Sequence, residues 1–121
     1  MTVANEVHEG SAISQILQLC DGPVTQMSEG GRNFIFMPGL RFYAQGRDMK
    51  MDALLCLNHV NPTYPTKLYL AEKVESRLNW NETAYLFGRS WHTFSWSNVS
   101  PNQSVFEILA AHLAPLSQEA K

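Results

Sequence analysis

The sequence predicts a single α+β domain with a short N-terminal helix, an antiparallel β-meander of about four strands, an irregular aromatic segment and a C-terminal helix. Apolar residues recur at helical spacing near both ends of the chain, and short alternating segments separated by glycine and proline fill the middle. A length of 121 residues with 45% hydrophobic and 17% charged residues is typical of one globular domain. We expect this domain to span residues 11–116, between a flexible tail at 1–10 and a C-terminal tail at 117–121.

The first expected element is a helix at residues 11–20. Ser11 is a suitable N-cap, and the apolar residues that follow it share one helical face. These residues are Ile13, Ile16, Leu17 and Cys20. Asp21-Gly22-Pro23 then ends the helix, because proline cannot continue it.

Segments of strand character follow this helix. A short strand is expected at 24–27, and Pro38-Gly39 predicts a tight turn between strands at 33–37 and 40–43. The edge at 33–37 would then be a docking strand for a partner, since unpaired edges invite pairing. The rest of the meander comprises a turn at 46–48, an apolar run at 54–57 typical of a central strand, and a strand at 67–71.

Periodicity fades between residues 74 and 99, but this stretch is rich in aromatic side chains. We therefore expect an irregular segment folded against the sheet rather than a disordered one. Ser100-Pro101-Asn102-Gln103 has the form of a capping box and predicts the start of the last helix, which should end near Ala114 because Pro115 follows. Its apolar face would comprise Val105, Ile108, Leu109, His112, Leu113 and Leu116.

Charge and motif content exclude several function classes. The net charge is −2 and the nine basic residues are scattered, which argues against a nucleic acid or an anionic membrane as partner. No stretch is long and apolar enough to span a membrane, and the N-terminal residues do not resemble a signal peptide, so we expect a cytoplasmic protein. Gly30-Gly31 and Gly39 lack the spacing of a phosphate-binding loop, and the four histidines form no metal-binding pair, so no cofactor or metal is predicted.

An ordered set of motifs appears in the second half of the chain. Leu55-Cys56-Leu57 leads into Tyr64-Pro65, and Leu68-Tyr69-Leu70 follows; then come Trp96-Ser97, Pro101 and the last helix. In this order, residues 50–116 resemble the ubiquitin-conjugating (UBC-like) fold, and most of all its divergent bacterial branch, which is encoded beside ubiquitin-like modifiers. Residues 11–45 match that family only in the order of elements. The resemblance implies a UBC-like scaffold.

The chain also departs from that family. The family carries its modifier as a thioester on a cysteine several residues before the tryptophan, and residues 82–95 contain no cysteine. The family's His-Pro-Asn motif is missing, and Thr66-Lys67 stands where two prolines are usual. The resemblance therefore implies the scaffold without its usual nucleophile, with a binding surface at Tyr64, Pro65, Trp91 and Trp96.

Two kinds of nucleophile can be weighed from the sequence. Cys20 and Cys56 lie in apolar surroundings and are expected to be buried and inert. A hydroxyl could form an oxyester instead, with Ser90, Thr93 or Ser95 as acceptor and His92 as general base. The simpler interpretation is that these polar residues hydrogen-bond within a tight aromatic loop.

The sequence leaves three functions open. The first is a UBC-like protein that binds a ubiquitin-like modifier or its activating enzyme without forming a cysteine thioester. The second is a conjugating enzyme that uses a serine or threonine oxyester, and the third is a non-enzymatic adaptor or structural domain, because a fold does not dictate a function. Whether the chain is an enzyme and whether it forms a homo-oligomer are equally open.

Overall fold

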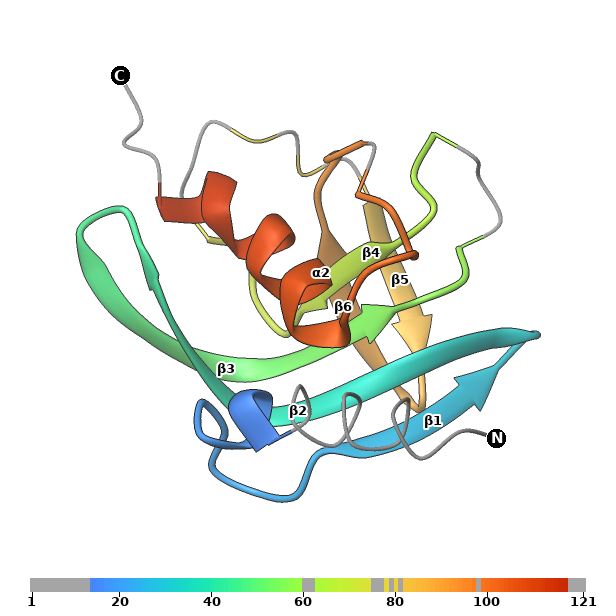
Figure 1. The fold of residues 1–121 in the computed structure, drawn as a ribbon, viewed down its shortest axis with the longest axis horizontal. Coiled ribbons are helices and arrows are strands. Elements are labelled where there is room, and N and C mark those ends of the chain that lie inside the picture. The colour runs from blue at the N-terminus through green and yellow to red at the C-terminus, as the bar shows by residue number, and fades with distance from the viewer. Residues whose placement is uncertain are drawn as a thin grey trace.

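The computed structural model describes residues 14–59, 63–74, 78, 80, 82–97 and 99–117. Within these residues the fold is α+β, with one six-stranded antiparallel sheet and a helix, α2, on one of its faces (Figure 1). The strand order is β1-β2-β3-β4-β6-β5. The elements are β1 (Thr25–Glu29), β2 (Arg32–Ala44), β3 (Arg47–Cys56), β4 (Lys67–Leu70), β5 (Glu82–Leu86), β6 (Arg89–Thr93), α2 (Val105–Leu113) and a 3-10 turn (Ala114–Ser117).

The expected N-terminal helix is helical at residues 14–17, where Ile16 is fully buried. Its predicted N-cap, Ser11, lies outside the described residues, as do the tail at 1–10 and residues 118–121 of the predicted C-terminal tail. Among the described residues, no helix has the length and apolar character needed to cross a membrane.

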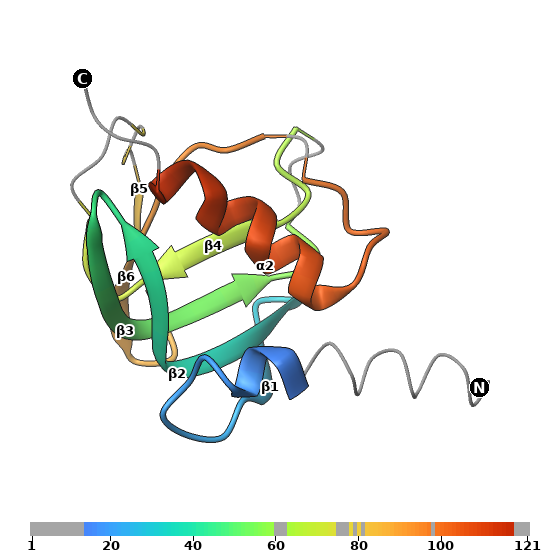
Figure 2. The same cartoon turned by 60° about the vertical axis from the view of Figure 1, so that its left-hand side comes forward.

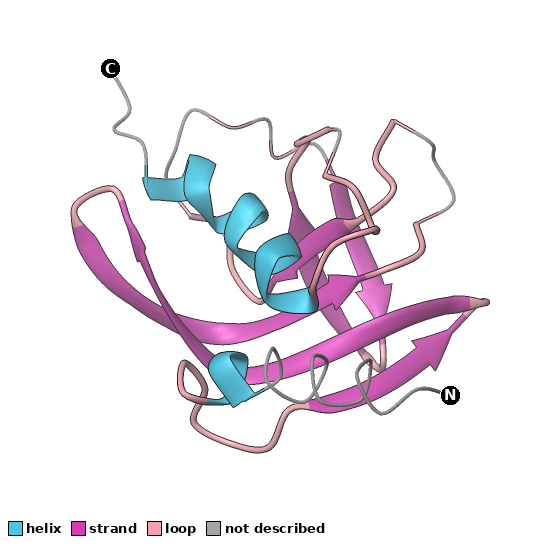
Figure 3. Cartoon of the chain, viewed as in Figure 1, coloured by secondary structure: helices cyan, strands magenta, loops and turns pink. Residues whose placement is uncertain are grey.

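The predicted count of four strands is wrong, because the stretch expected to be irregular contains the hairpin β5–β6 (Figure 3). Phe87 and Gly88 connect the two strands with φ angles of 52° and 80°. Two positive φ angles define the turn that matches the twist of a tight hairpin. Phe-Gly is a poor sequence signal for this turn, since asparagine or aspartate usually precedes the glycine. The described remainder of the aromatic segment has no regular secondary structure.

The predicted hairpin around Pro38-Gly39 is also wrong. Both residues lie inside β2, whose pairing with β3 shifts register between Met37 and Leu40. Gly39 has a φ of 58°, and its N–H donates to Asp52 Oδ1 at 2.8 Å. Because this carboxylate satisfies the displaced amide, the strand continues through the bulge instead of turning back.

Residues 33–37 are consequently not an edge, contrary to the docking-strand expectation. They pair with β1 on one side and with β3 on the other. The turn that precedes them is Gly30-Gly31, with φ angles of 61° and 78°. Within the described part of the chain, β1 and β5 are the strands that pair on one side only.

The sheet carries an apolar cluster on each face. On one face α2 and the residues after it pack against strands β2 to β4, as Figure 2 shows. The fully buried Ile35, Leu55, Leu70 and Ile108 belong to this cluster. The opposite cluster comprises Phe34, Leu54, Cys56, Tyr69, Leu86 and Trp91.

The sheet is curled around the second cluster. Phe87 N donates to Glu29 Oε1 at 3.1 Å, and the rings of Phe34 and Phe87 meet edge to face at 5.3 Å. The hydrogen bond joins the β5–β6 turn to the end of β1 and the ring contact joins it to β2, although the edge strands β1 and β5 are at opposite ends of the strand order. The hairpin therefore covers part of the face that α2 leaves uncovered.

Helix α2 begins four residues later than the capping box at Ser100 predicted. Ser104 is the N-cap: its Oγ accepts from Glu107 N at 3.2 Å, and its own N–H donates to Glu107 Oε1 at 3.1 Å. The Ser100 hydroxyl accepts from Asn102 N instead, in the turn before the helix. The end of the helix at Leu113 agrees with the prediction, since assigned helix ends vary by one or two residues.

Candidate functional site

The outward face of the β5–β6 hairpin gathers two of the predicted catalytic residues. Thr83 pairs with His92, and Tyr85 pairs with Ser90, so these four side chains share one face of the two strands. We call them the hairpin polar face. Thr83, Tyr85 and Ser90 are exposed, and His92 is half-buried. The face therefore presents three hydroxyls and one imidazole to solvent.

His92 lies next to the hydroxyl of Thr83, a residue that no sequence pattern indicated as a candidate. Its Nδ1 is 3.3 Å from Thr83 Oγ1, close to the reach that a general base needs. Ser90 is two residues from His92 on the same strand, where consecutive same-face side chains stand about 7 Å apart. Thr83 was missed because it is nine residues away in sequence, and only the strand register brings it to His92.

Thr93 and Trp91 point to the other side of β6 and have structural contacts. Thr93 is buried and its hydroxyl donates to Leu68 O at 2.7 Å, which ties β6 to β4. Trp91 is 1% exposed, and its Nε1–H donates to Leu86 O at 3.0 Å. Both polar groups are satisfied inside the fold, so neither faces a reactant.

Ser95 and Trp96 follow β6 in the connection to α2. Ser95 is half-buried, whereas Trp96 is 36% exposed. Trp96 is thus one of the few large apolar side chains that the described surface presents, together with Leu17, Tyr43 and Tyr85. An exposed tryptophan is the residue type most often found at the centre of binding surfaces.

The Tyr64-Pro65 corner is tied to the start of β5. Both residues are half-buried, and Pro65 O accepts from His59 N at 3.0 Å. Lys67 Nζ lies 5.3 Å from the Tyr64 ring centroid and 3.0 Å from Glu82 Oε1. Of the four predicted binding residues, only Trp91 lies in the cluster on the sheet face opposite α2.

A buried polar network lies beneath this corner. The Thr66 hydroxyl donates to Val99 O at 3.1 Å and lies 2.9 Å from His112 Nε2. A hydroxyl has one hydrogen to donate, so Nε2–H must donate to the Thr66 oxygen. Burial, reinforced by the positive charge of Lys67, lowers the pKa of His112 to about 4. Thr66, the residue before β4, is thus hydrogen-bonded both to the connection between β6 and α2 and to α2 itself.

The thiols of Cys20 and Cys56 are buried to different degrees. Cys56 is fully buried in β3, which confirms the sequence expectation, and burial raises its pKa. Cys20 is half-buried after the N-terminal helical turn, and burial is also the main cause that raises its pKa. A raised pKa keeps each thiol protonated at neutral pH, and the thiol is a poor nucleophile.

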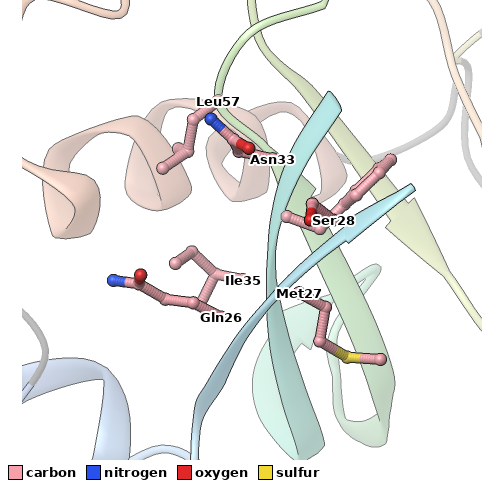
Figure 4. A pocket seen from close by; sticks show the side chains of 7 residues that line it. Gln26, Met27, Ser28, Asn33, Ile35 and Leu57 are labelled. Carbon is pink, nitrogen blue, oxygen red and sulfur yellow. The ribbon is translucent and has the colours of Figure 1, made fainter. Parts of the chain in front are cut away.

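Two hollows flank β1. The first, of about 400 Å³, is an open depression along β1 and β2, where Figure 4 shows Gln26, Ile35 and Leu57 pointing to the same side of the strands. The second is smaller, about 130 Å³, and lies on the hairpin side of the sheet. It is lined by Met27, Phe36, Leu54, Phe87, Arg89 and Trp91, and we call it the Arg89 slot. No sequence pattern indicated this slot, because its lining residues come from four strands and a turn.

Among the described residues, no three histidine, cysteine, aspartate or glutamate side chains gather where they could hold a metal ion. The fold and these sites define a curled antiparallel sheet with a capping helix, a polar hairpin face and a small apolar slot. No protein-family model, curated protein or solved structure matches the chain.

Proposed function

We propose that the chain is a UBC-like protein of a bacterial ubiquitin-like conjugation system that binds the modifier or its activating enzyme without a cysteine thioester. The observation that carries this proposal is the state of the thiols. Cys56 is fully buried, Cys20 is half-buried, and burial raises the pKa of both. A thioester carrier needs an exposed thiolate. Without one, the function that we infer for a UBC-like scaffold is non-covalent binding of the modifier or its activating enzyme.

The binding surface that we propose lies around the loop between β6 and α2. Trp96 is exposed there, and the nearby buried network of Thr66, Val99 and His112 holds this loop against the helix. An aromatic side chain on a firmly held loop loses little entropy on binding. We include Tyr64 in the proposed surface, because its half-buried ring lies at the corner before β4 and Thr66, two residues later, is bonded to the same loop.

The test is a binding measurement between the chain, a modifier encoded beside it and that modifier's activating enzyme. We expect Trp96→Ala to weaken binding about tenfold or more, as truncation of an interface anchor does. Tyr43→Ala is the matched control, because Tyr43 is also a large exposed aromatic but lies at the far end of β2. A variant with Cys20→Ser and Cys56→Ala should bind as the parent chain does. If the parent chain forms a thiol-sensitive adduct with the modifier and this double variant does not, the proposal is contradicted.

One observation favours a second candidate function, a hydroxyl oxyester. In this mechanism Thr83 Oγ1 attacks the carbonyl carbon of a modifier thioester held by the activating enzyme, and the hydroxyl proton passes to His92 Nδ1. A C–O bond forms, the C–S bond breaks, and the departing thiolate takes the proton from the imidazolium. The 3.3 Å contact between Thr83 Oγ1 and His92 Nδ1 is close to the reach that such a proton transfer needs, and it supports this candidate.

The two candidates differ in the adduct they form. An oxyester adduct would resist thiols, break in hydroxylamine and disappear in Thr83→Val, while Thr83→Ser would retain it. Ser90→Ala and Ser95→Ala test the two serines in the same assay. Non-covalent binding without an adduct supports the first candidate. If neither binding nor an adduct is observed, the adaptor function remains.

A further inference from the structure

The Arg89 slot is an apolar hollow with a cation at its mouth. Leu54 and Trp91 are buried and form its floor, while Met27, Phe36 and Phe87 are half-buried and form its walls. The Phe34–Phe87 ring contact and the bond from Phe87 N to Glu29 Oε1 lie beside the Phe87 wall. Arg89 is the one charged residue in the lining.

Arg89 is held in place before any ligand arrives. Its guanidinium stacks on Trp91 at 4.4 Å from the ring centroid, and Nη1 donates to Asp52 Oδ2 at 2.9 Å. Asp52 is itself fixed by the bond from Gly39 N to its other oxygen. A guanidinium has five N–H donors, and Asp52 engages one of its nitrogens. The remaining donors are presented by a side chain that is 44% exposed.

A second, polar hollow begins where the slot ends. It has a volume of about 490 Å³, and Arg89 belongs to the lining of both hollows. The polar hollow extends past Asp52 to the bulge at Gly39 and to Asp21 and Lys50. A ligand in the slot can therefore continue as a polar chain without leaving the surface.

We propose that the Arg89 slot binds the C-terminal residue of a polypeptide. One apolar side chain fills the slot, the terminal carboxylate pairs with the free donors of Arg89, and the preceding residues lie in the polar hollow. The size of the slot matches one side chain, and its walls select an apolar one. The guanidinium forms an ion pair with Asp52, and its remaining N–H groups can donate to a carboxylate. The site is on the sheet face opposite α2 and does not depend on the function proposed above.

The probe is the acetylated tripeptide Ala-Ala-Leu with a free carboxylate, titrated into the ¹⁵N-labelled chain. The Trp91 indole N–H and the Arg89 Nε–H signals report on the slot. We expect both to shift, and the same peptide with a C-terminal amide to bind about tenfold more weakly, because a hydrogen bond to a charged group is lost. Equal binding of acid and amide, or no shift with either, would overturn the proposal.

Three variants and one further ligand keep the outcome clear. Arg89→Gln should weaken the acid peptide about tenfold and leave the amide peptide unchanged, and Met27→Trp should block both by filling the slot. Tyr85→Ala, an exposed change on the opposite face of the hairpin, should alter neither. Hexanoate carries the carboxylate and the apolar group without peptide bonds; if it binds as tightly as the tripeptide, the ligand is a fatty acid and the proposal fails. A circular dichroism spectrum confirms that each variant is folded.

Discussion

The two faces of the sheet are closed in different ways. On one face α2 and the turn after it cover a large cluster, with the buried hydrogen bonds of Thr66 and His112 at its edge. On the other face a two-stranded hairpin covers a smaller cluster, and its turn is held to β1 by one hydrogen bond and to β2 by one ring contact. The helix face therefore has the contacts of a stable core, whereas the hairpin face leaves apolar surface accessible in the Arg89 slot.

This difference suggests separate roles for the two faces, with the helix face stabilising the fold and the hairpin face available for binding. A hairpin held by a few contacts opens locally at a lower free energy than a packed core does. Binding sites are drawn from such regions because a ligand needs access. If the two faces differ in this way, substitutions on them should differ in their effects on global stability and on local opening.

The largest effect is expected at Trp91, the centre of the hairpin face. Trp91→Ala removes its contacts with the cluster and its bond to Leu86 O, and we expect a loss of about 3–5 kcal/mol in the free energy of unfolding. Urea unfolding measures it. Ile108→Ala on the helix face should cost about 2–5 kcal/mol, and Trp91→Phe less than Trp91→Ala. A loss below about 1 kcal/mol for Trp91→Ala would mean that the hairpin cluster is not part of the cooperative core.

The next largest effect is a loss of stability at low pH, caused by protonation of His112 on the helix face. The pKa of His112 is about 4 in the folded state, below the ordinary value of 6.5 that we take for the unfolded chain. Between these two values the unfolded chain binds the additional proton, so stability is complete above pH 6.5 and falls as the pH decreases toward 4. At about 1.4 kcal/mol per pKa unit, the loss is about 3 kcal/mol.

Urea unfolding at pH 7 and at pH 4 measures this loss. His112→Gln cannot take up a proton, and its neutral amide can still donate to the Thr66 oxygen. Its stability should change less with pH than that of the parent chain. An equal change in both would place the pH dependence on other groups.

The sequence predicted the parts of the fold that local patterns determine. The α+β class, the strand β4 and the end of α2 follow from hydrophobic periodicity and from Pro115. It failed at Pro38-Gly39 because a contact distant in sequence decided the outcome: Asp52 keeps β2 continuous there. The helix cap was missed for a different reason, since Ser104 and Glu107 form a second capping box that is as local as the one expected at Ser100.

The same limit applies to the candidate sites. Ser90 and His92 could be identified because they are two residues apart in sequence. Thr83 and Arg89 acquire their neighbours through strand pairing and through the curl of the sheet. No local pattern encodes such contacts, so a site formed across strands required the structure.

A smaller effect than protonation of His112 is expected at Thr66. Thr66→Val keeps the shape of the side chain but leaves His112 Nε2–H and Val99 O without their partner, which costs about 1–3 kcal/mol for buried polar groups. Thr66→Ser keeps the hydroxyl and should cost less. Urea unfolding at pH 7 compares the two. If Thr66→Val is as stable as Thr66→Ser, the network contributes nothing to the helix face.

The smallest effect is expected at Glu29 and tests how the hairpin is held. Glu29→Ala removes the acceptor of the Phe87 N–H, whereas Glu29→Gln retains an amide oxygen there. Because this bond joins the turn to β1 rather than stabilising a core, we expect the alanine variant to unfold at nearly the same urea concentration. Amide exchange at Phe87 should accelerate about two- to fivefold, the equivalent of one lost hydrogen bond. Exchange at Leu55 in β3 should not change, because that amide is protected by the core. If exchange accelerates equally at both positions, the hairpin opens only when the whole chain unfolds, and the two faces of the sheet do not differ in the stability of their covers.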